Sequence, residues 1–199
     1  TTDAGTLVLR DVARHAIDHG HDLPITASHC VSLGQQDAAV IEETARLVAE
    51  AGIGVVTLPQ TNLYLQGRGV TTGSPRGLTA IDALRAAGAR VAGGGDNWRD
   101  PFNPLGRIDP METASLMISA GHQRIAGAYR SVSADARAVM GLEPVSLAPG
   151  SVADLLLIEG ASLADAIAGA SQRRIVIKGG RVIAHTTVSR EVDDEIWSD

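Results

Sequence analysis

Short apolar runs alternate with segments of helical periodicity along the first half of the chain. The runs lie at residues 23–28, 53–58 and 90–95, and the helical segments lie at 3–20, 36–51 and 79–88. A short apolar run predicts a buried strand, and apolar residues at helical spacing predict an amphipathic helix. Right-handed crossovers would place such strands side by side in a parallel sheet. We therefore predict an α/β fold, with Asp3 capping the first helix and Gly20 ending it.

Polar residues follow each of the three predicted strands. His29 follows the first strand, a long loop at 59–75 follows the second, and Asp96 follows the third. In parallel sheets, ligands bind outside the carboxyl ends of the strands, and loops of this length tend to be functional. Glycines at 93–95 leave room for a close approach to Asp96. We expect a functional site at this edge; the alternative is that Asp96 only caps the following turn.

In the second half of the chain, predicted helices give way to a turn-rich segment and predicted strands near residue 144. Asp109 and Pro110 predict a helix start, and we expect helices at 111–120, 123–129 and 133–140. Strands are expected at 153–158, 174–178 and 181–184, the last two joined by the two-residue turn Gly179-Gly180. These strands are too few for a sheet of their own, so we expect them to complete a small β domain. The predicted domains are 1–143 and 144–199.

Composition narrows the classes of partner. The 199 residues carry a formal net charge of -6 and 44% hydrophobic residues, with no basic run that could track phosphates. The single cysteine, Cys30, cannot form an internal disulfide or a Cys-x-x-Cys zinc site. No apolar run is long enough to span a bilayer. We expect a globular cytoplasmic chain that binds neither nucleic acid nor membrane, and Thr1 in place of methionine suggests that something upstream has been removed.

Four motifs, in this order, resemble the bacterial cytosine deaminase-like branch of the amidohydrolase superfamily. They are Ile-Thr-Ala-Ser-His at 25–29, Asn-Leu-Tyr-Leu-Gln-Gly-Arg at 62–68, the turn from Gly95 to Gly106 and Pro-Gly-Ser-Val-Ala-Asp-Leu at 149–155. The resemblance implies a metal-dependent (β/α)8 TIM-like barrel flanked by a small β-sandwich, with the active site at the C-terminal face of the barrel. This chain would then supply the last three strands of the barrel and the C-terminal strands of the sandwich.

The resemblance also implies roles for individual residues. Asp96 matches an aspartate that ligates one catalytic divalent metal ion, zinc or iron, and accepts a proton from the attacking water. A carboxylate suits both tasks. His29 matches a histidine that lies beside the metal and polarises the substrate or its water; the alternative is a surface histidine bonded to backbone. Phe102 matches an aromatic position that covers the substrate.

Substrate recognition is expected at three amide side chains. Asn97 matches a position next to the metal-binding aspartate, where the cytosine-specific enzyme carries a second aspartate, so that a related ring or an N-alkyl amide remains possible. Gln66 and Asn62 each offer an amide donor and acceptor to a ring edge. The alternative for Gln66 and Asn62 is hydrogen bonding to loop backbone.

The other motifs of the family are absent. The resemblance implies that a complete enzyme has a His-x-His pair and a His-x-x-Glu segment, and that this chain begins just past the second. His19-Gly20-His21 matches the first pattern as letters, but it precedes a strand and is expected at the opposite face from His29 and Asp96.

Two functions remain open from the sequence. One is a metal-dependent deaminase or amidohydrolase that acts on a C–N bond of a cytosine-like or triazine-like ring, active only with its missing N-terminal half. The other is a non-catalytic half-barrel binding or scaffold protein that closes by self-association. Three barrel strands would leave two open edges and an uncovered face with Val55, Leu58 and Val91, so we expect a homo-oligomer.

Overall fold

The structure is a computed structural model that describes residues 3–191. The chain divides into two compact units, residues 1–144 and 145–199. Within residues 3–191, no helix has the length and apolar character needed to cross a membrane.

A parallel sheet forms the centre of the first unit. Its strands are β1 (Thr26–Ser28), β2 (Gly54–Thr57) and β3 (Val91–Gly93), in the order β1-β2-β3. Ala27 lies opposite Val55, which lies opposite Val91, and both pairings are parallel. The predicted α/β alternation is therefore confirmed, and the carboxyl ends of all three strands meet at one edge of the sheet.

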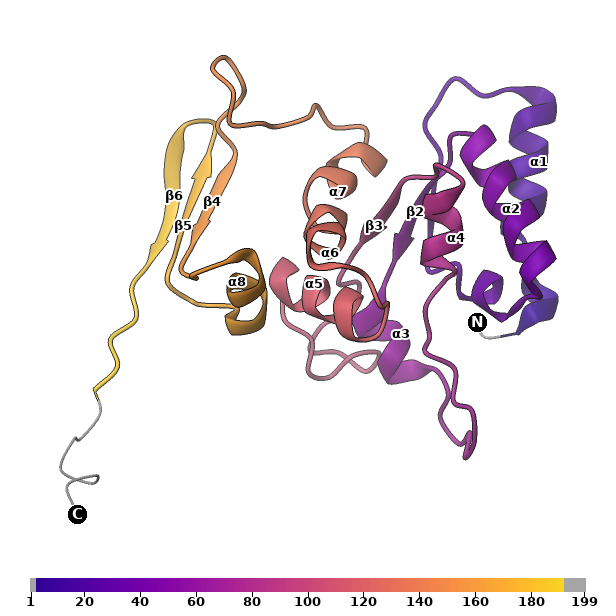
Figure 1. The fold of residues 1–199 in the computed structure, drawn as a ribbon, viewed down its shortest axis with the longest axis horizontal. Helices are drawn as coiled ribbons and strands as arrows, with labels where there is room; N and C mark the ends of the chain where they lie inside the picture. The colour runs from indigo at the N-terminus through magenta and orange to yellow at the C-terminus, as the bar shows by residue number, and fades with distance from the viewer. Residues whose placement is uncertain (1–2, 192–199) are drawn as a thin grey trace. The chain divides into compact units, whose positions relative to one another are not determined.

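Helices connect and flank these strands. They are α1 (Leu9–His19), α2 (Ala38–Glu50), α3 (Pro59–Leu65), α4 (Ile81–Ala86), α5 (Pro110–Ser119), α6 (Ile125–Ser131) and α7 (Ala134–Val139), with short 3-10 turns η1 (Ala4–Thr6) and η2 (Val31–Gln35). In the view of Figure 1, β2 and β3 lie between α2 and α4 on one side and α5, α6 and α7 on the other. Asp109 caps α5 and Pro110 opens it, as predicted.

Asp3 does not cap the first long helix. Its side chain accepts a hydrogen bond from the Gly5 amide and caps η1, whereas α1 starts after Val8 without a side-chain cap. The prediction failed because a separate 3-10 turn intervenes between Asp3 and the helix. Gly20, with φ 67°, ends α1 as expected.

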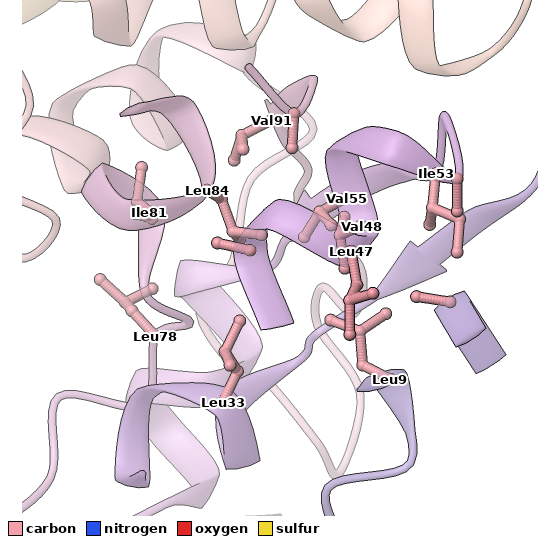
Figure 2. Packing of buried hydrophobic residues seen from close by; sticks show 14 of the residues in the cluster. Leu9, Leu33, Leu47, Val48, Ile53, Val55, Leu78, Ile81, Leu84 and Val91 are labelled. Carbon is pink, nitrogen blue, oxygen red and sulfur yellow. The ribbon is translucent and has the colours of Figure 1, made fainter. Parts of the chain in front are cut away.

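The hydrophobic core lies between the sheet and the helices that connect its strands. Figure 2 shows side chains from α1, α2, β2, α4 and β3 pointing toward one another, among them Leu47, Val55 and Leu84. Val55, Leu58 and Val91 are only 0%, 7% and 1% exposed. The expectation that these three residues mark an uncovered face was therefore wrong, because helices and neighbouring segments of the same unit already cover them.

The segment predicted as a loop at 59–75 begins with a helix. Helix α3 has Pro59 at its first position, and its first turn is buried: Pro59, Gln60, Thr61 and Asn62. Hydrophobic periodicity could not reveal this helix because three of its four buried residues are polar. Pro at the first helical position was the available signal.

The second unit contains an antiparallel sheet and one helix. The expectation that its three predicted strands are too few for a sheet of their own was wrong, because both neighbouring pairs are hydrogen-bonded. Its elements are β4 (Leu155–Ile158), α8 (Leu163–Gly169), β5 (Arg174–Lys178) and β6 (Arg181–Thr186), with sheet order β4-β5-β6. Gly179 and Gly180 have φ values of 55° and 77°, which suits the predicted tight hairpin. Helix α8 was not predicted, although Ser162 caps it by accepting a hydrogen bond from the Asp165 amide, a recognisable helix-start pattern.

Candidate active site

His29 lies directly after β1 at the carboxyl edge of the sheet. Its amide donates to the Val56 carbonyl oxygen at 2.9 Å, which extends the β1–β2 ladder by one bond. Its φ of 62° is in the left-handed region, so the chain turns sharply after the strand. The ladder hydrogen bond fixes the backbone position of His29, and the turn directs the chain away from the strand.

Asp96 lies at the corresponding end of β3. The Gly94 amide donates to the Thr57 carbonyl oxygen at 2.9 Å, and Asp96 has a φ of 60°. A Cβ atom on Gly94 would lie 2.8 Å from the Leu58 side chain, so a larger residue would displace the strand end. The absence of bulk at Gly94 lets the chain pass close to β2 before Asp96.

The two predicted catalytic side chains lie close together. His29 Nε2 is 3.7 Å from Asp96 Oδ2, and the side chains are 41% and 29% exposed. This distance is too long for a direct hydrogen bond. The two atoms are nevertheless near enough to act on one small group. Both side chains are partly open to solvent.

Asn62 holds the other side of the His29 ring. Its Oδ1 atom lies 2.9 Å from His29 Nδ1, while its Nδ2 atom is buried without a hydrogen-bond partner among the described residues. Asn62 is 1% exposed. Because an amide oxygen can only accept, Nδ1 is the donor in this contact. The other ring nitrogen, Nε2, is the one that faces Asp96.

Gln66 follows Asn62 by one helical turn. Its amide donates to the Asn62 carbonyl oxygen at 2.9 Å and ends α3. Its Oε1 atom is buried without a hydrogen-bond partner among the described residues. Asn62 Nδ2 and Gln66 Oε1 are thus a buried donor and a buried acceptor without a partner among the described residues.

The turn after Asp96 is held by Asp100. Asp100 Oδ2 accepts a hydrogen bond from Asn97 Nδ2 at 2.7 Å, and Oδ1 accepts from the Phe102 and Asn103 amides at 2.8 and 2.9 Å. Desolvation works in the opposite direction, but these hydrogen bonds lower the pKa of the Asp100 carboxyl below its usual value. The side-chain amide of Asn97 is thus bound within the turn. Phe102, in contrast, is 55% exposed.

Sequence analysis missed Thr61, which links α3 to the Asp96 segment. Thr61 Oγ1 accepts a hydrogen bond from the Asn97 amide at 3.0 Å and donates to the Gly95 carbonyl oxygen at 3.4 Å. No sequence signal identifies it, because the pairing depends on how α3 packs against the end of β3.

The residues present fit part of a metal site. His29 and Asp96 offer an imidazole nitrogen and a carboxylate oxygen, which are both zinc ligand types. Among residues 3–191, no group of three or more His, Cys, Asp or Glu side chains could hold a metal ion. His21 bonds instead to the carbonyl oxygens of Leu23 and Ala51, at the opposite end of the strands.

Comparison with known protein families places the chain in a known family of hydrolases. The model of the Amidohydrolase family matches residues 1–184, and the chain belongs to this family. Together with the relatives described next, this match confirms the resemblance to the deaminase branch of the amidohydrolase superfamily.

Several relatives are deaminases or amidohydrolases by name. The chain is 34% identical over 201 residues to the pterin deaminase of Rhizobium rhizogenes, covering 98% of this chain and 46% of that protein. The crystal structure of 5-methylcytosine deaminase from Klebsiella pneumoniae superposes with a TM-score of 0.87 and 25% identity, covering 97% of this chain and 48% of that one. N-isopropylammelide isopropylaminohydrolase from Burkholderia multivorans follows at a TM-score of 0.71 and 28% identity, covering 92% and 44%. The chain therefore spans about half the length of these relatives.

Proposed function

We propose that this chain is the C-terminal half of a metal-dependent hydrolase that attacks a C–N bond of a heterocyclic ring, as a deaminase or amidohydrolase does. The observation that carries the proposal is the 3.7 Å approach of His29 Nε2 to Asp96 Oδ2. Membership of the amidohydrolase family and the deaminases among the relatives support the reaction class.

In this proposal Asp96 is the base and His29 is the polarising group. The Asp96 carboxylate accepts a proton from the attacking water, and the same carboxylate is a suitable metal ligand. His29 Nε2 lies beside it and, with the ring proton on Nδ1, accepts a hydrogen bond from the attacking water and so polarises that water. A divalent ion, zinc or iron, bound by Asp96 and by ligands from outside this chain, would supply Lewis-acid activation.

The proposed substrate is a small cytosine-like or triazine-like ring. Three relatives are named for pterin, 5-methylcytosine and N-isopropylammelide, which supports a nitrogen-containing ring but leaves its identity open. We propose that Asn62 and Gln66 present an amide donor and an acceptor to the edge of such a ring, which the lack of partners for Asn62 Nδ2 and Gln66 Oε1 among the described residues supports. Asn97 and the exposed ring of Phe102 are proposed to line and cover the substrate.

The missing part of the enzyme is proposed to complete both domains. In this proposal β1, β2 and β3 are the last three strands of a (β/α)8 barrel formed by residues 1–143 with an N-terminal half. Residues 144–199 would complete a small β-sandwich. The relatives' greater length supports this arrangement, since the chain covers 46% and 48% of two of them. We propose a homo-oligomeric enzyme that acts in the cytoplasm.

Substitution of the two proposed catalytic residues tests this function in the complete protein. We expect Asp96→Asn and His29→Ala each to lower kcat by about 10²-fold or more, because each removes a group that handles a proton. The melting temperature should change little, since both side chains are partly exposed. Steady-state kinetics on 5-methylcytosine, pterin and ammelide derivatives, with thermal melts, measure both quantities.

Asp18→Asn, an exposed change on α1, is the control and should leave kcat unchanged. If Asp96→Asn turns over substrate at the wild-type rate, the assignment fails. Loss of folding without loss of turnover per folded molecule would make His29 a structural residue.

A further inference from the structure

One buried hydroxyl contacts the backbone on both sides of Asp96. Thr61 is 2% exposed, and its Oγ1 atom accepts a hydrogen bond from the Asn97 amide at 3.0 Å and donates to the Gly95 carbonyl oxygen at 3.4 Å. Gly95 and Asn97 are the immediate neighbours of Asp96 in the chain. Thr61 therefore restrains the two peptide groups that set the direction of the Asp96 side chain.

Asp96 needs such a restraint because its backbone is strained. Its φ of 60° lies in the left-handed region, which non-glycine residues keep only where surrounding contacts hold them. Gln60, the residue before Thr61, packs close to this segment, since a Cβ atom on Gly95 would lie 3.0 Å from Gln60 Oε1. Gln60 is itself held by Glu112 at 2.8 Å and by Thr113 at 3.3 Å.

The residue after Thr61 restrains the other proposed catalytic group in the same way. Asn62 Oδ1 lies 2.9 Å from His29 Nδ1, and His29 also has a left-handed backbone, with a φ of 62°. Thr61 and Asn62 are both in the buried first turn of α3. One buried turn thus contacts His29 and the two residues that flank Asp96.

We propose that Thr61 and Asn62 are positioning residues: together they set the separation and orientation of Asp96 and His29. This inference rests on the proposed function, because it assumes that these two groups carry the reaction. Neither Thr61 nor Asn62 needs to exchange a proton for this role. Their effect is to hold the reacting geometry before the substrate binds.

Kinetics of the complete protein provide the first test. Thr61→Val keeps the shape of the buried side chain but removes the hydroxyl, and we expect kcat to fall about tenfold while KM stays within about twofold. Thr61→Ser keeps the hydroxyl and should restore kcat to within about threefold of wild type. Asn62→Leu, which removes the acceptor for His29 Nδ1, should lower kcat at least as much as Thr61→Val.

The matched control is Thr44→Val in α2. Thr44 is 0% exposed, and its hydroxyl has no hydrogen-bond partner among the described residues, so its removal should leave kcat unchanged. A general cost of placing valine in a buried threonine site would appear in this control as well.

Hydrogen exchange of this chain provides a readout that does not depend on activity. Loss of the Thr61 acceptor should make the Asn97 amide exchange about tenfold faster in Thr61→Val, and Thr44→Val should leave it unchanged. The ¹⁵N shifts of the His29 ring should move in Asn62→Leu, because Nδ1 loses its partner.

The outcomes separate the two proposals. If Asp96→Asn retains full activity, the proposed function fails. If Asp96→Asn abolishes activity but Thr61→Val keeps wild-type kcat and Asn97 exchange, the positioning role is overturned and the function stands. If Thr61→Ser loses as much kcat as Thr61→Val, methyl packing rather than the hydroxyl is responsible, and the positioning role of the Thr61 hydroxyl is rejected.

Discussion

Left-handed backbone marks the residues at the carboxyl edge of the sheet. His29, Cys30 and Asp96 have φ values of 62°, 51° and 60°. Strained positions of this kind persist only where contacts compensate for them, and they cluster at functional sites. The conformations therefore support a functional edge independently of which residue types occupy it.

Cys30 shares this edge but is not suited to act as a nucleophile. Burial raises the pKa of its thiol from 9.0 to about 11, so the thiolate is scarce at neutral pH. The pKa is higher in the folded chain than in the unfolded one. The unfolded chain therefore loses this proton first as the pH rises.

We predict that alkylation of Cys30 by iodoacetamide in the folded chain stays slow at pH 9.0 and rises toward pH about 11. The free energy of unfolding should fall over the same interval. The stability that the protonated Cys30 thiol contributes is fully present below the pKa of the unfolded chain, and it is lost as the pH rises through the pKa of the folded chain. Rates of alkylation and urea midpoints measured against pH check both statements.

The urea-unfolded chain is the control and should react with an ordinary thiol pKa. In Cys30→Ala, the fall in stability over this pH interval should be smaller than in the wild-type chain, because the thiol is absent. Rapid alkylation of the folded chain at neutral pH would contradict the prediction.

At the scale of elements, two polar segments shape the candidate site. The buried first turn of α3 holds His29 and the neighbours of Asp96, and the turn at 97–106 folds around Asp100. Hydrogen bonds contribute to the order of both segments. The loss of a single acceptor should therefore destabilise either segment, and for the turn at 97–106 the effect should depend on pH through Asp100.

For the turn, we predict that Asp100→Ala lowers the urea midpoint of this chain at pH 7, because the Asn97 side chain and two amides lose an acceptor. The folded pKa of Asp100 is depressed, so its contribution is present above the unfolded pKa. It is lost as the pH falls through the folded pKa. The difference between variant and wild type should thus narrow below pH about 4.

Urea titrations at pH 7 and at lower pH measure this difference. Asp18→Ala, an exposed change on α1, should show no comparable loss at pH 7. A constant difference down to low pH would mean that the ionised Asp100 carboxylate does not stabilise the turn.

At the scale of the whole molecule, the sheet of the first unit has two open edges among the described residues. Among the described residues, β1 and β3 each pair on one side only, with β2. Unpaired strand edges favour association with another chain. The same edges are where strands of a missing half would add.

We predict that this chain alone binds no catalytic metal with useful affinity, because a catalytic zinc has about three protein ligands. No group of three or more His, Cys, Asp or Glu side chains suited to a metal occurs within residues 3–191. Co-expression with the N-terminal half should give about one metal ion per pair and restore hydrolysis. Elemental analysis and activity assays of both preparations are the measurements.

Asp96→Ala in the co-expressed pair is the matched variant and should lose both the metal and the activity. Stoichiometric zinc or iron in the isolated chain, together with turnover, would contradict the prediction. An inactive and metal-free pair would instead favour a binding or scaffold role.

The sequence alone was sufficient for much of the fold. Alternating apolar runs and helical segments predicted the parallel strands, Asp109 and Pro110 predicted the start of α5, and Gly179-Gly180 predicted the hairpin. These features depend on local preferences and on burial patterns with a fixed period, so they can be read directly from neighbouring residues. His29 and Asp96 could be singled out for the same reason, because each directly follows a predicted strand.

Only the tertiary structure decided how the site is supported. The first turn of α3 is buried on polar side chains, so no apolar pattern predicts it, and the contacts of Thr61 join residues 34 and 36 positions apart. The 33-residue separation of Asn62 from His29 is of the same kind. A sequence shows which groups can form hydrogen bonds, but which of them meet depends on how the strands and α3 pack, and packing is a property of the whole fold.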